Sequence, residues 1–366
     1  MINTTIFPAK YIQGFNAIER LGDEMKLLGS NGYMVCDSFV YDNLLDSFRQ
    51  NVESGVKAKF EKFEGECSDE EVERLVKIAE KDNCDLVVGI GGGKALDTAK
   101  AVAHEMKVPV IIVPTIASTD APCSALSVIY TPQGEFKRYL ILPMNPNVVI
   151  VDTGIIAQAP SRFLVAGMGD ALATWFEADS AMTKYAANLT GDIGSMTAHS
   201  LSRLCYDTLL EFGVFAKSSC DARSVTPAFE KIVEANTLLS GVGFESGGLG
   251  AAHSIHNGLT VLEKVHDYYH GEKVAYGVIA SLFLTGKPKY IIDEVYDFCE
   301  SVGLPITLAE IGLEDVSDDD LMKVAEATCA EGETIHNEPI PVTPETVKFA
   351  LNSADEEGRR RKKSDS

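Results

Sequence analysis

The sequence lacks any apolar run long enough to cross a membrane. A membrane-spanning helix needs roughly 20 consecutive apolar residues, and no segment of the 366-residue chain approaches that length. Met1–Lys10 also lacks the basic and then apolar order of a secretory leader. With 45% hydrophobic residues, the chain is expected to be a soluble globular protein that remains in the cytoplasm.

Closely spaced cysteines are also missing. The eight cysteines are scattered, and no two of them form a Cys-X-X-Cys motif. Disulfide frameworks and structural zinc knuckles use cysteines at close and regular spacings. The pattern therefore argues against both and favours reduced thiols in a cytoplasmic setting.

Positive charge is scarce. The chain has 54 acidic and 32 basic residues, which gives a formal net charge of −22. This excess disfavours nucleic acid and anionic membranes as partners, because both are negatively charged. The basic cluster Arg359–Lys363 lies among acidic and polar residues near the C-terminus. It is interpreted as a solvated tail, with a subunit contact as the alternative.

Residues 1–160 alternate between strand and helix patterns, and 160 is the expected domain boundary. Strands are expected at 32–37, 56–63, 85–90, 108–114 and 148–152, helices at 68–81 and 94–105, and a hairpin at 126–141. Strands that alternate with helices form parallel sheets with right-handed crossovers. The predicted fold class is an α/β domain with a parallel, Rossmann-like sheet that binds a dinucleotide.

Residues 161–366 show helical periodicity only, and they are expected to form an all-α second domain. Helices are expected near 161–180, 193–213, 226–242, 249–262, 271–285 and 288–301. The length of the chain allows a separate core for each domain. Because ligands of open α/β sheets bind beyond the carboxyl ends of the strands, the active site is expected in the cleft between the two domains.

The usual nucleotide-binding fingerprints are absent, but a different glycine-rich turn is present. Neither GxGxxG nor the GKS or GKT ending of a phosphate loop occurs. Instead, the run Gly89–Lys94 (GIGGGK) joins an apolar strand pattern to a helix pattern. Consecutive glycines let backbone N–H groups converge on an anion at a helix N-terminus. The turn is interpreted as a phosphate cradle, with a ligand-free tight turn as the alternative.

Polar residues at other predicted strand ends are candidate ligand contacts. Asp37 ends the first strand, where a carboxylate can accept hydrogen bonds from ribose hydroxyls, although an ordinary loop aspartate is equally consistent. The hydroxyl-rich loop 115–124 suits phosphate, amide or polyol groups, and it equally suits capping of its own backbone. Asp120 in this loop is expected to face the same cleft as the glycine turn.

Histidines cluster in the second half of the chain. His253, His256, His266 and His270 fall within one short window, and imidazoles are good ligands for zinc or iron(II). The spacing fits no zinc-finger rule, so a carboxylate from another helix is expected to complete a site. Asp170 lies among apolar residues, where an unpaired carboxylate is costly. Its alternative role is to cap a kink at the glycines nearby.

Taken together, these stretches resemble the superfamily of iron-containing alcohol dehydrogenases and dehydroquinate synthase, and in particular its glycerol-oxidising bacterial members. The resemblance covers essentially the whole chain. It is most specific at 89–100, 114–130, 169–177, 241–258 and 268–275. It implies an NAD-dependent oxidoreductase that converts glycerol to dihydroxyacetone, accepts related vicinal diols such as 1,2-propanediol, and acts in reverse on hydroxyketones. It also implies a homo-oligomer, often an octamer.

The resemblance assigns roles to individual residues. It implies one zinc ion per subunit, held by the catalytic residues Asp170, His253 and His270, with Asp120 as the catalytic contact to the polyol. The implied NAD contacts are Asp37 at the adenosine ribose; Gly92, Gly93, Lys94 and Asp97 around the pyrophosphate; and Thr115, Ser118, Ser124, Leu126 and Tyr130 along the rest of the cofactor.

One position departs from the wider superfamily. Iron-dependent members carry a histidine four residues after the ligand aspartate, whereas this chain has Thr174. Three protein ligands with an open position are typical of catalytic zinc, so the departure favours zinc over iron. His256 and His266 receive no ligand role. A packing role is expected for His256, with support of a ligand as the alternative.

Two other functions fit the sequence less well. A cyclising lyase or a dehydrogenase for phosphorylated polyols needs several basic residues to hold substrate anions, yet Lys264 is the only lysine or arginine between Leu249 and Glu272. A nucleotide-binding regulator without catalysis has no need of an aspartate and two histidines from separate helices. The sequence therefore favours the dehydrogenase.

Overall fold

A computed structural model describes residues 1–364 of the chain. The chain folds into two compact units. One comprises Ile6–Pro160 and Ser219–Gly241 and is called the α/β unit; the other comprises Met1–Thr5, Ser161–Ser218 and the chain from Val242 onward and is called the helical unit. The short segment Ser219–Gly241 thus returns to the α/β unit after the chain has left it.

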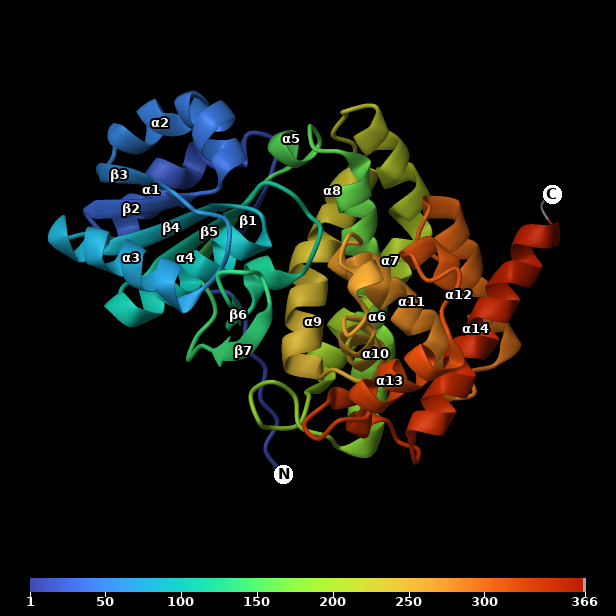
Figure 1. The fold of residues 1–366 in the computed structure, drawn as a ribbon. Coiled ribbons are helices and arrows are strands. Elements are labelled where there is room, and N and C mark those ends of the chain that lie inside the picture. Colours follow the sequence, from blue (N-terminus) through green and yellow to red (C-terminus); the bar gives the residue numbers. More distant parts are fainter. Residues whose placement is uncertain (365–366) are drawn as a thin grey trace. The chain divides into compact units, whose positions relative to one another are not determined.

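The centre of the α/β unit is a six-stranded sheet with the order β1-β8-β5-β4-β2-β3 (Figure 1). Every neighbouring pair of strands is parallel, which confirms the predicted sheet. The strands are β1 (Tyr11–Gly14), β2 (Asn31–Cys36), β3 (Lys57–Lys62), β4 (Leu86–Gly91), β5 (Val110–Pro114) and β8 (Val148–Asp152). Strand β1, a short edge strand that pairs with β8, was not predicted from the sequence.

Helices cover both faces of this sheet. On one face lie η1 (Ala17–Arg20), α1 (Leu21–Leu28), η2 (Val40–Leu44) and α2 (Leu45–Glu53), which share a core with alternate residues of the central strands. The opposite face carries α3 (Asp69–Lys81) and α4 (Gly93–Met106). Burial on both faces explains why the central strands read as nearly continuous apolar runs. The predicted helices at 68–81 and 94–105 are confirmed within a few residues.

Further elements complete the α/β unit. The predicted hairpin is confirmed as β6 (Leu126–Tyr130) and β7 (Phe136–Ile141), which form a separate antiparallel sheet. The short helices are η3 (Ala121–Cys123), α5 (Thr153–Ile156), α8 (Pro227–Glu234) and η4 (Ala235–Leu239). Because α8 and η4 lie in the returning segment, residues far apart in the sequence share this unit.

The helical unit contains no strand among residues 161–364, as predicted. Its helices are α6 (Ser161–Lys184), α7 (Met196–Asp221), α9 (Ser240–Gly247), α10 (Ala251–Leu259), η5 (Glu263–Val265), α11 (His270–Leu284), α12 (Lys289–Val302), η6 (Leu308–Ile311), α13 (Asp318–Thr328), η7 (Thr334–Asn337) and α14 (Pro344–Ser364). Helices α7 and α9 each cross a boundary between the units. Helix α11 is buried at every position from Gly271 to Leu282 and forms the centre of the unit. Within the described residues, no helix combines the length and apolar character needed to cross a membrane.

Candidate functional site

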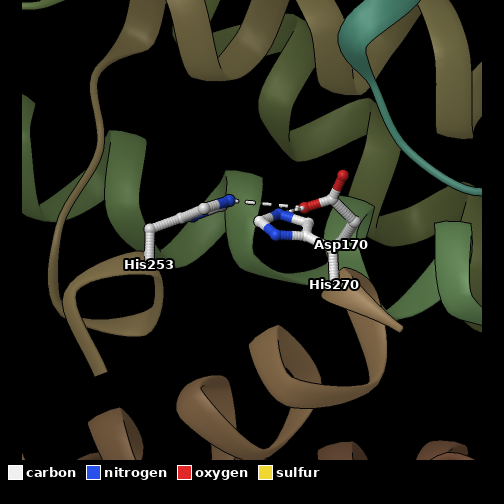
Figure 2. Close-up of side chains that lie close together, drawn as sticks. All are labelled: Asp170, His253 and His270. Atoms are coloured by element: carbon white, nitrogen blue, oxygen red, sulfur yellow. Dashed lines mark hydrogen bonds and ion pairs between the residues drawn. The ribbon is translucent and has the colours of Figure 1, made fainter. Parts of the chain in front are cut away.

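Three side chains of the helical unit converge on one point. Asp170 from the middle of α6, His253 from α10 and His270 from the start of α11 bring their ligand atoms within 4.8 Å of one another. The Nε2 atoms of His253 and His270 lie 3.3 Å and 3.1 Å from the same carboxylate oxygen of Asp170 (Figure 2). These residues form a metal-binding triad.

Asp170 is a buried carboxylate held by its two histidine partners. Its side chain is only 1% exposed, and α6 runs unbroken from Ser161 to Lys184 around it. The observed partners of Asp170 are therefore the two histidines, as the metal-ligand interpretation requires. Burial raises the pKa of Asp170, but the charge of His270 and hydrogen bonds from both histidines outweigh burial and hold the pKa well below its usual range.

Two glycines let α6 and α11 cross closely enough to form the triad. A Cβ atom on Gly271 would lie 1.8 Å from the carbonyl oxygen of Ala166, and one on Gly169 would lie 2.3 Å from the carbonyl oxygen of Gly271. Neither position has room for a larger side chain, because the obstructing atoms belong to the backbone. Each glycine is adjacent in sequence to a ligand of the triad, so the close crossing sets the distance between Asp170 and His270.

The first turn of α11 is fixed by an ion pair and a cap. Glu272 accepts a hydrogen bond of 2.8 Å from the backbone N–H of Tyr269, which satisfies a donor at the helix N-terminus. Its two oxygens also accept bonds of 2.6 Å and 2.9 Å from the guanidinium of Arg162 on α6. Glu272 lies two residues after His270, so this contact with Arg162 links the first turn of α11 to α6, the helix that carries Asp170.

The start of α10 is held by two buried carboxylates. Glu338 accepts a bond of 2.9 Å from the N–H of Ala251, and Glu177 accepts one of 2.9 Å from the N–H of His253. Negative charge is favourable at the positive end of a helix. Burial raises the pKa of Glu338, and Ser180 donates a further hydrogen bond to its other oxygen.

Glu177 also orients the ring of His253. Its second oxygen lies 2.6 Å from Nδ1 of His253, so the opposite ring nitrogen, Nε2, faces Asp170. Burial lowers the pKa of His253, but the charge of Glu177 and the hydrogen bonds to both carboxylates raise it well above its usual value. A carboxylate behind a ligating histidine is the usual arrangement in zinc sites.

The donor set fits a catalytic zinc ion. Two imidazole nitrogens and one carboxylate oxygen make three protein ligands, and zinc in catalytic sites leaves a further position open. Donors at zinc bond lengths in a tetrahedron lie about 3.3–3.4 Å apart, close to the 3.3 Å and 3.1 Å found between Asp170 and the histidines. The side chain of His270 is 38% exposed while that of Asp170 is 1% exposed, so the triad is accessible from the side of His270.

Two histidines of the cluster are not part of the triad: His256 contacts the triad, whereas the contact of His266 lies elsewhere. His256 Nε2 lies 3.1 Å from Nδ1 of His270, and the rings meet edge to face with centroids 4.2 Å apart. His266 instead contacts the carbonyl oxygen of Thr260. Burial and the positive charges of His270, Lys273 and His253 lower the pKa of His256 well below its usual value.

The glycine turn of the α/β unit depends on Asp37 and Gly91. Gly91 has a φ of 150°, and a Cβ atom there would lie 2.5 Å from Oδ2 of Asp37, so only glycine fits. The carboxylate of Asp37 accepts bonds of 3.0 Å from the N–H of Gly92 and 2.8 Å from that of Val40. The sequence predicted a turn whose amides are directed at a bound anion, whereas the N–H of Gly92 is directed at Asp37. The first turn of α4 begins at Gly93, where backbone N–H groups have no partner within the helix.

The other predicted cofactor residues lie on α4, in the loop after β5 and on β6. Lys94 forms a 2.5 Å ion pair with Glu66 and lies 5.3 Å from the ring centroid of Tyr130. Asp97 is buried; it forms a 2.9 Å ion pair with Lys100 and accepts a bond of 2.9 Å from the N–H of Val128. Thr115, Ser118, Ser124 and Leu126 follow β5 and lead into β6.

Asp120, the predicted substrate contact, lies in the α/β unit and is buried. Its Oδ2 atom accepts a bond of 2.8 Å from the hydroxyl of Ser240, which belongs to the returning segment. The structure thus groups the metal triad within the helical unit and the predicted cofactor residues, with Asp120, within the α/β unit.

Several residues that build these sites were missed by the sequence analysis. Glu177 lies two helical turns after Asp170 on the same face of α6, a spacing that could have identified it. Lys100 interrupts a run of small and apolar residues in α4, a pattern that could have identified it, and the structure shows that it is buried. Ser240 left no local signal, because its contact with Asp120 spans 120 residues.

Known proteins match this chain over nearly its whole length. Residues 8–153 match the family model described as iron-containing alcohol dehydrogenase. The chain is 67% identical to a glycerol dehydrogenase of Thermotoga maritima, with 99% of both chains covered. It is 52% identical to a glycerol dehydrogenase of Citrobacter freundii, with 97% of this chain and 98% of that protein covered. Among solved structures, a glycerol dehydrogenase of Schizosaccharomyces pombe matches with a TM-score of 0.95 at 38% identity, covering 99% of this chain and 93% of that chain.

Proposed function

Because the chain belongs to the iron-containing alcohol dehydrogenase family, we propose that it is a zinc-dependent enzyme that oxidises glycerol to dihydroxyacetone with NAD. The observation that carries the proposal is the triad of Asp170, His253 and His270, whose ligand atoms lie within 4.8 Å of one another. Similarity to glycerol dehydrogenases over nearly the whole chain supports the choice of substrate.

The triad residues hold the metal and leave room for the substrate. A bound zinc ion acts as a Lewis acid that lowers the pKa of a hydroxyl group, and NAD accepts the hydride. Asp170 supplies negative charge at a buried position, while Glu177 and the helix crossing fix the histidine rings. Vicinal diols such as 1,2-propanediol present the same pair of neighbouring oxygens as glycerol, so we expect them to be substrates, and hydroxyketones to react in the reverse direction.

The α/β unit is proposed to bind NAD. Asp37 would lie at the adenosine ribose, and the start of α4, with Gly92, Gly93, Lys94 and Asp97, would lie at the pyrophosphate. Thr115, Ser118, Ser124, Leu126 and Tyr130 would follow the rest of the cofactor, with Asp97 and Lys100 fixing the strand and loop that carry them.

Asp120 is proposed to accept a hydrogen bond from the polyol. Ser240 donates a hydrogen bond of 2.8 Å to one oxygen of its carboxylate, which fixes the orientation of the side chain. We propose that the α/β unit acts as the cofactor-binding domain and that the helical unit acts as the metal- and substrate-binding domain.

The setting proposed for the enzyme is the cytoplasm, since all eight cysteines are free thiols. A homo-oligomer, with the octamer as its proposed form, follows from the family resemblance.

The direct test compares glycerol with a phosphorylated polyol. We expect NADH to form from NAD with glycerol and with 1,2-propanediol, and not with glycerol 3-phosphate. The reason is that no cluster of lysine or arginine lies near the triad in the sequence to hold a phosphate. Turnover of glycerol 3-phosphate with no reaction of glycerol would contradict the proposed substrate, while leaving the fold and the cofactor unaffected.

A further inference from the structure

We propose that His256, Asn257 and Glu333 form a chain of hydrogen bonds that fixes the tautomer of His270, so that its Nε2 lone pair is directed at the metal. They are positioning residues, since none of them belongs to the triad. The proposal rests on the metal centre proposed above and names the residues that prepare one of its ligands.

The chain begins at a carboxylate whose hydrogen-bonding role is unambiguous. Glu333 can only accept when ionised, and its two oxygens lie 3.3 Å and 3.0 Å from Nδ2 of Asn257. The amide nitrogen of Asn257 therefore faces Glu333. Its oxygen, Oδ1, consequently faces the opposite way, where it lies 3.1 Å from Nδ1 of His256.

This amide orientation determines the tautomer of His256. An amide oxygen is an acceptor only, so Nδ1 of His256 must carry the proton that it donates to Asn257. A neutral imidazole with a proton on Nδ1 has a lone pair on Nε2, and this atom lies 3.1 Å from Nδ1 of His270.

The same reasoning passes to His270. Because Nε2 of His256 is an acceptor, Nδ1 of His270 must donate, and the lone pair of a neutral His270 then lies on Nε2. Nε2 of His270 lies 3.1 Å from Oδ1 of Asp170, which is also an acceptor. Two lone pairs at this distance repel each other unless a proton or a metal ion is shared between them, and a bound zinc ion would take this shared position.

The chain of hydrogen bonds from Glu333 through Asn257 and His256 to His270, called the relay below, has a fixed position. The reason is that η7 is hydrogen-bonded to α10 and to the residues just before it. Thr334 donates a bond of 2.9 Å to the carbonyl oxygen of Gly250, the N–H of Ile335 donates one of 2.7 Å to Ser254, and Asn337 donates one of 2.9 Å to the carbonyl oxygen of Leu249. These contacts set the register of η7 on α10. Glu333, which directly precedes η7, is thereby held opposite Asn257.

The two ligand histidines are therefore prepared in different ways. His253 has a carboxylate, Glu177, at its Nδ1 atom, whereas His270 has a neutral imidazole at the same atom. Both arrangements leave Nε2 for the metal. A neutral partner adds no second negative charge beside His270, which is the more exposed of the two ligands.

The test is the zinc affinity of the full-length protein, measured at fixed pH by competition with a chromophoric chelator. His256→Phe keeps a ring of similar volume and removes the acceptor, so zinc affinity should fall by about 10–100-fold. His256→Gln keeps an acceptor oxygen and should bind zinc nearly as tightly as the unaltered protein. Asn257→Leu removes the acceptor for His256 and should also lower zinc affinity. If His256→Phe does not fold, this variant tests the relay in its place.

The matched control is His266→Phe, which alters a neighbouring histidine outside the relay and should leave zinc affinity unchanged. A packing role for His256 predicts the reverse order, with phenylalanine tolerated and glutamine harmful, and that order would overturn the relay. Equal zinc affinity in all variants would also overturn the relay while the metal centre stands. Failure of the unaltered protein to bind zinc would overturn the metal centre and the relay with it.

Discussion

Each side chain of the triad is held by its own contacts. Asp170 is buried in the middle of α6, and Glu177 orients the ring of His253. His270 is the first residue of α11 and contacts His256. A metal site needs such preorganisation because a ring that rotates freely binds more weakly. The contacts behind the ligands therefore contribute to metal affinity as well as to the stability of the fold.

Glu177 provides the clearest residue-scale prediction. Glu177→Gln removes the negative charge that raises the pKa of His253 and supports it as a ligand. We expect zinc affinity to fall by about tenfold, measured by the same chelator competition, with glycerol turnover falling at limiting zinc. Asp179→Asn is the matched control, since Asp179 also pairs with a histidine, His199, outside the triad. Equal zinc affinity in both variants would show that Glu177 serves only to cap α10.

At the scale of elements, Lys100 joins α4 to the loop and strand that carry the proposed cofactor contacts. Its ammonium group is fully buried, forms a 2.9 Å ion pair with Asp97, and donates a bond of 3.0 Å to the carbonyl oxygen of Ala121 and another to that of Leu126. One buried charge thus satisfies acceptors from three segments. Buried charges persist in this way only when they are fully paired.

Replacing this lysine should destabilise the α/β unit strongly. Lys100→Met leaves Asp97 buried without its partner, and breaking a buried pair costs about 3–5 kcal/mol in the free energy of unfolding. Unfolding by urea would measure this loss. Lys94→Met removes the more exposed ion pair with Glu66 and should cost less than about 1 kcal/mol. Similar losses in the two variants would contradict the structural importance assigned to Lys100.

At the scale of the whole molecule, the sequence predicted the parallel sheet and the helical second half because both depend on local periodicity. The same local signals could not reveal β1, a strand of four residues whose place in the sheet comes from pairing with β8. Nor could they show that Ser219–Gly241 joins the α/β unit, because only contacts across many residues, such as that of Ser240 with Asp120, establish this.

The candidate site was predicted in part from the residues and in part from the family resemblance. Local reasoning identified Asp170 and the histidine cluster, but it could not choose two ligands among four histidines. The resemblance named His253 and His270, and the structure places these two beside Asp170. For His256 the sequence favoured a packing role over support of a ligand, and the contact with His270 fits the second alternative, which the zinc affinities of the His256 variants test.

The most direct test of the central claim, that the triad holds the metal ion needed for glycerol oxidation, is a zinc titration of metal-free protein. The rate of NADH formation with glycerol should rise from near zero and level off at one zinc ion per chain. Asp170→Asn should stay inactive at every zinc concentration while still binding NAD. A metal-free protein that oxidises glycerol at the full rate, or an Asp170→Asn variant that zinc fully activates, would contradict the claim.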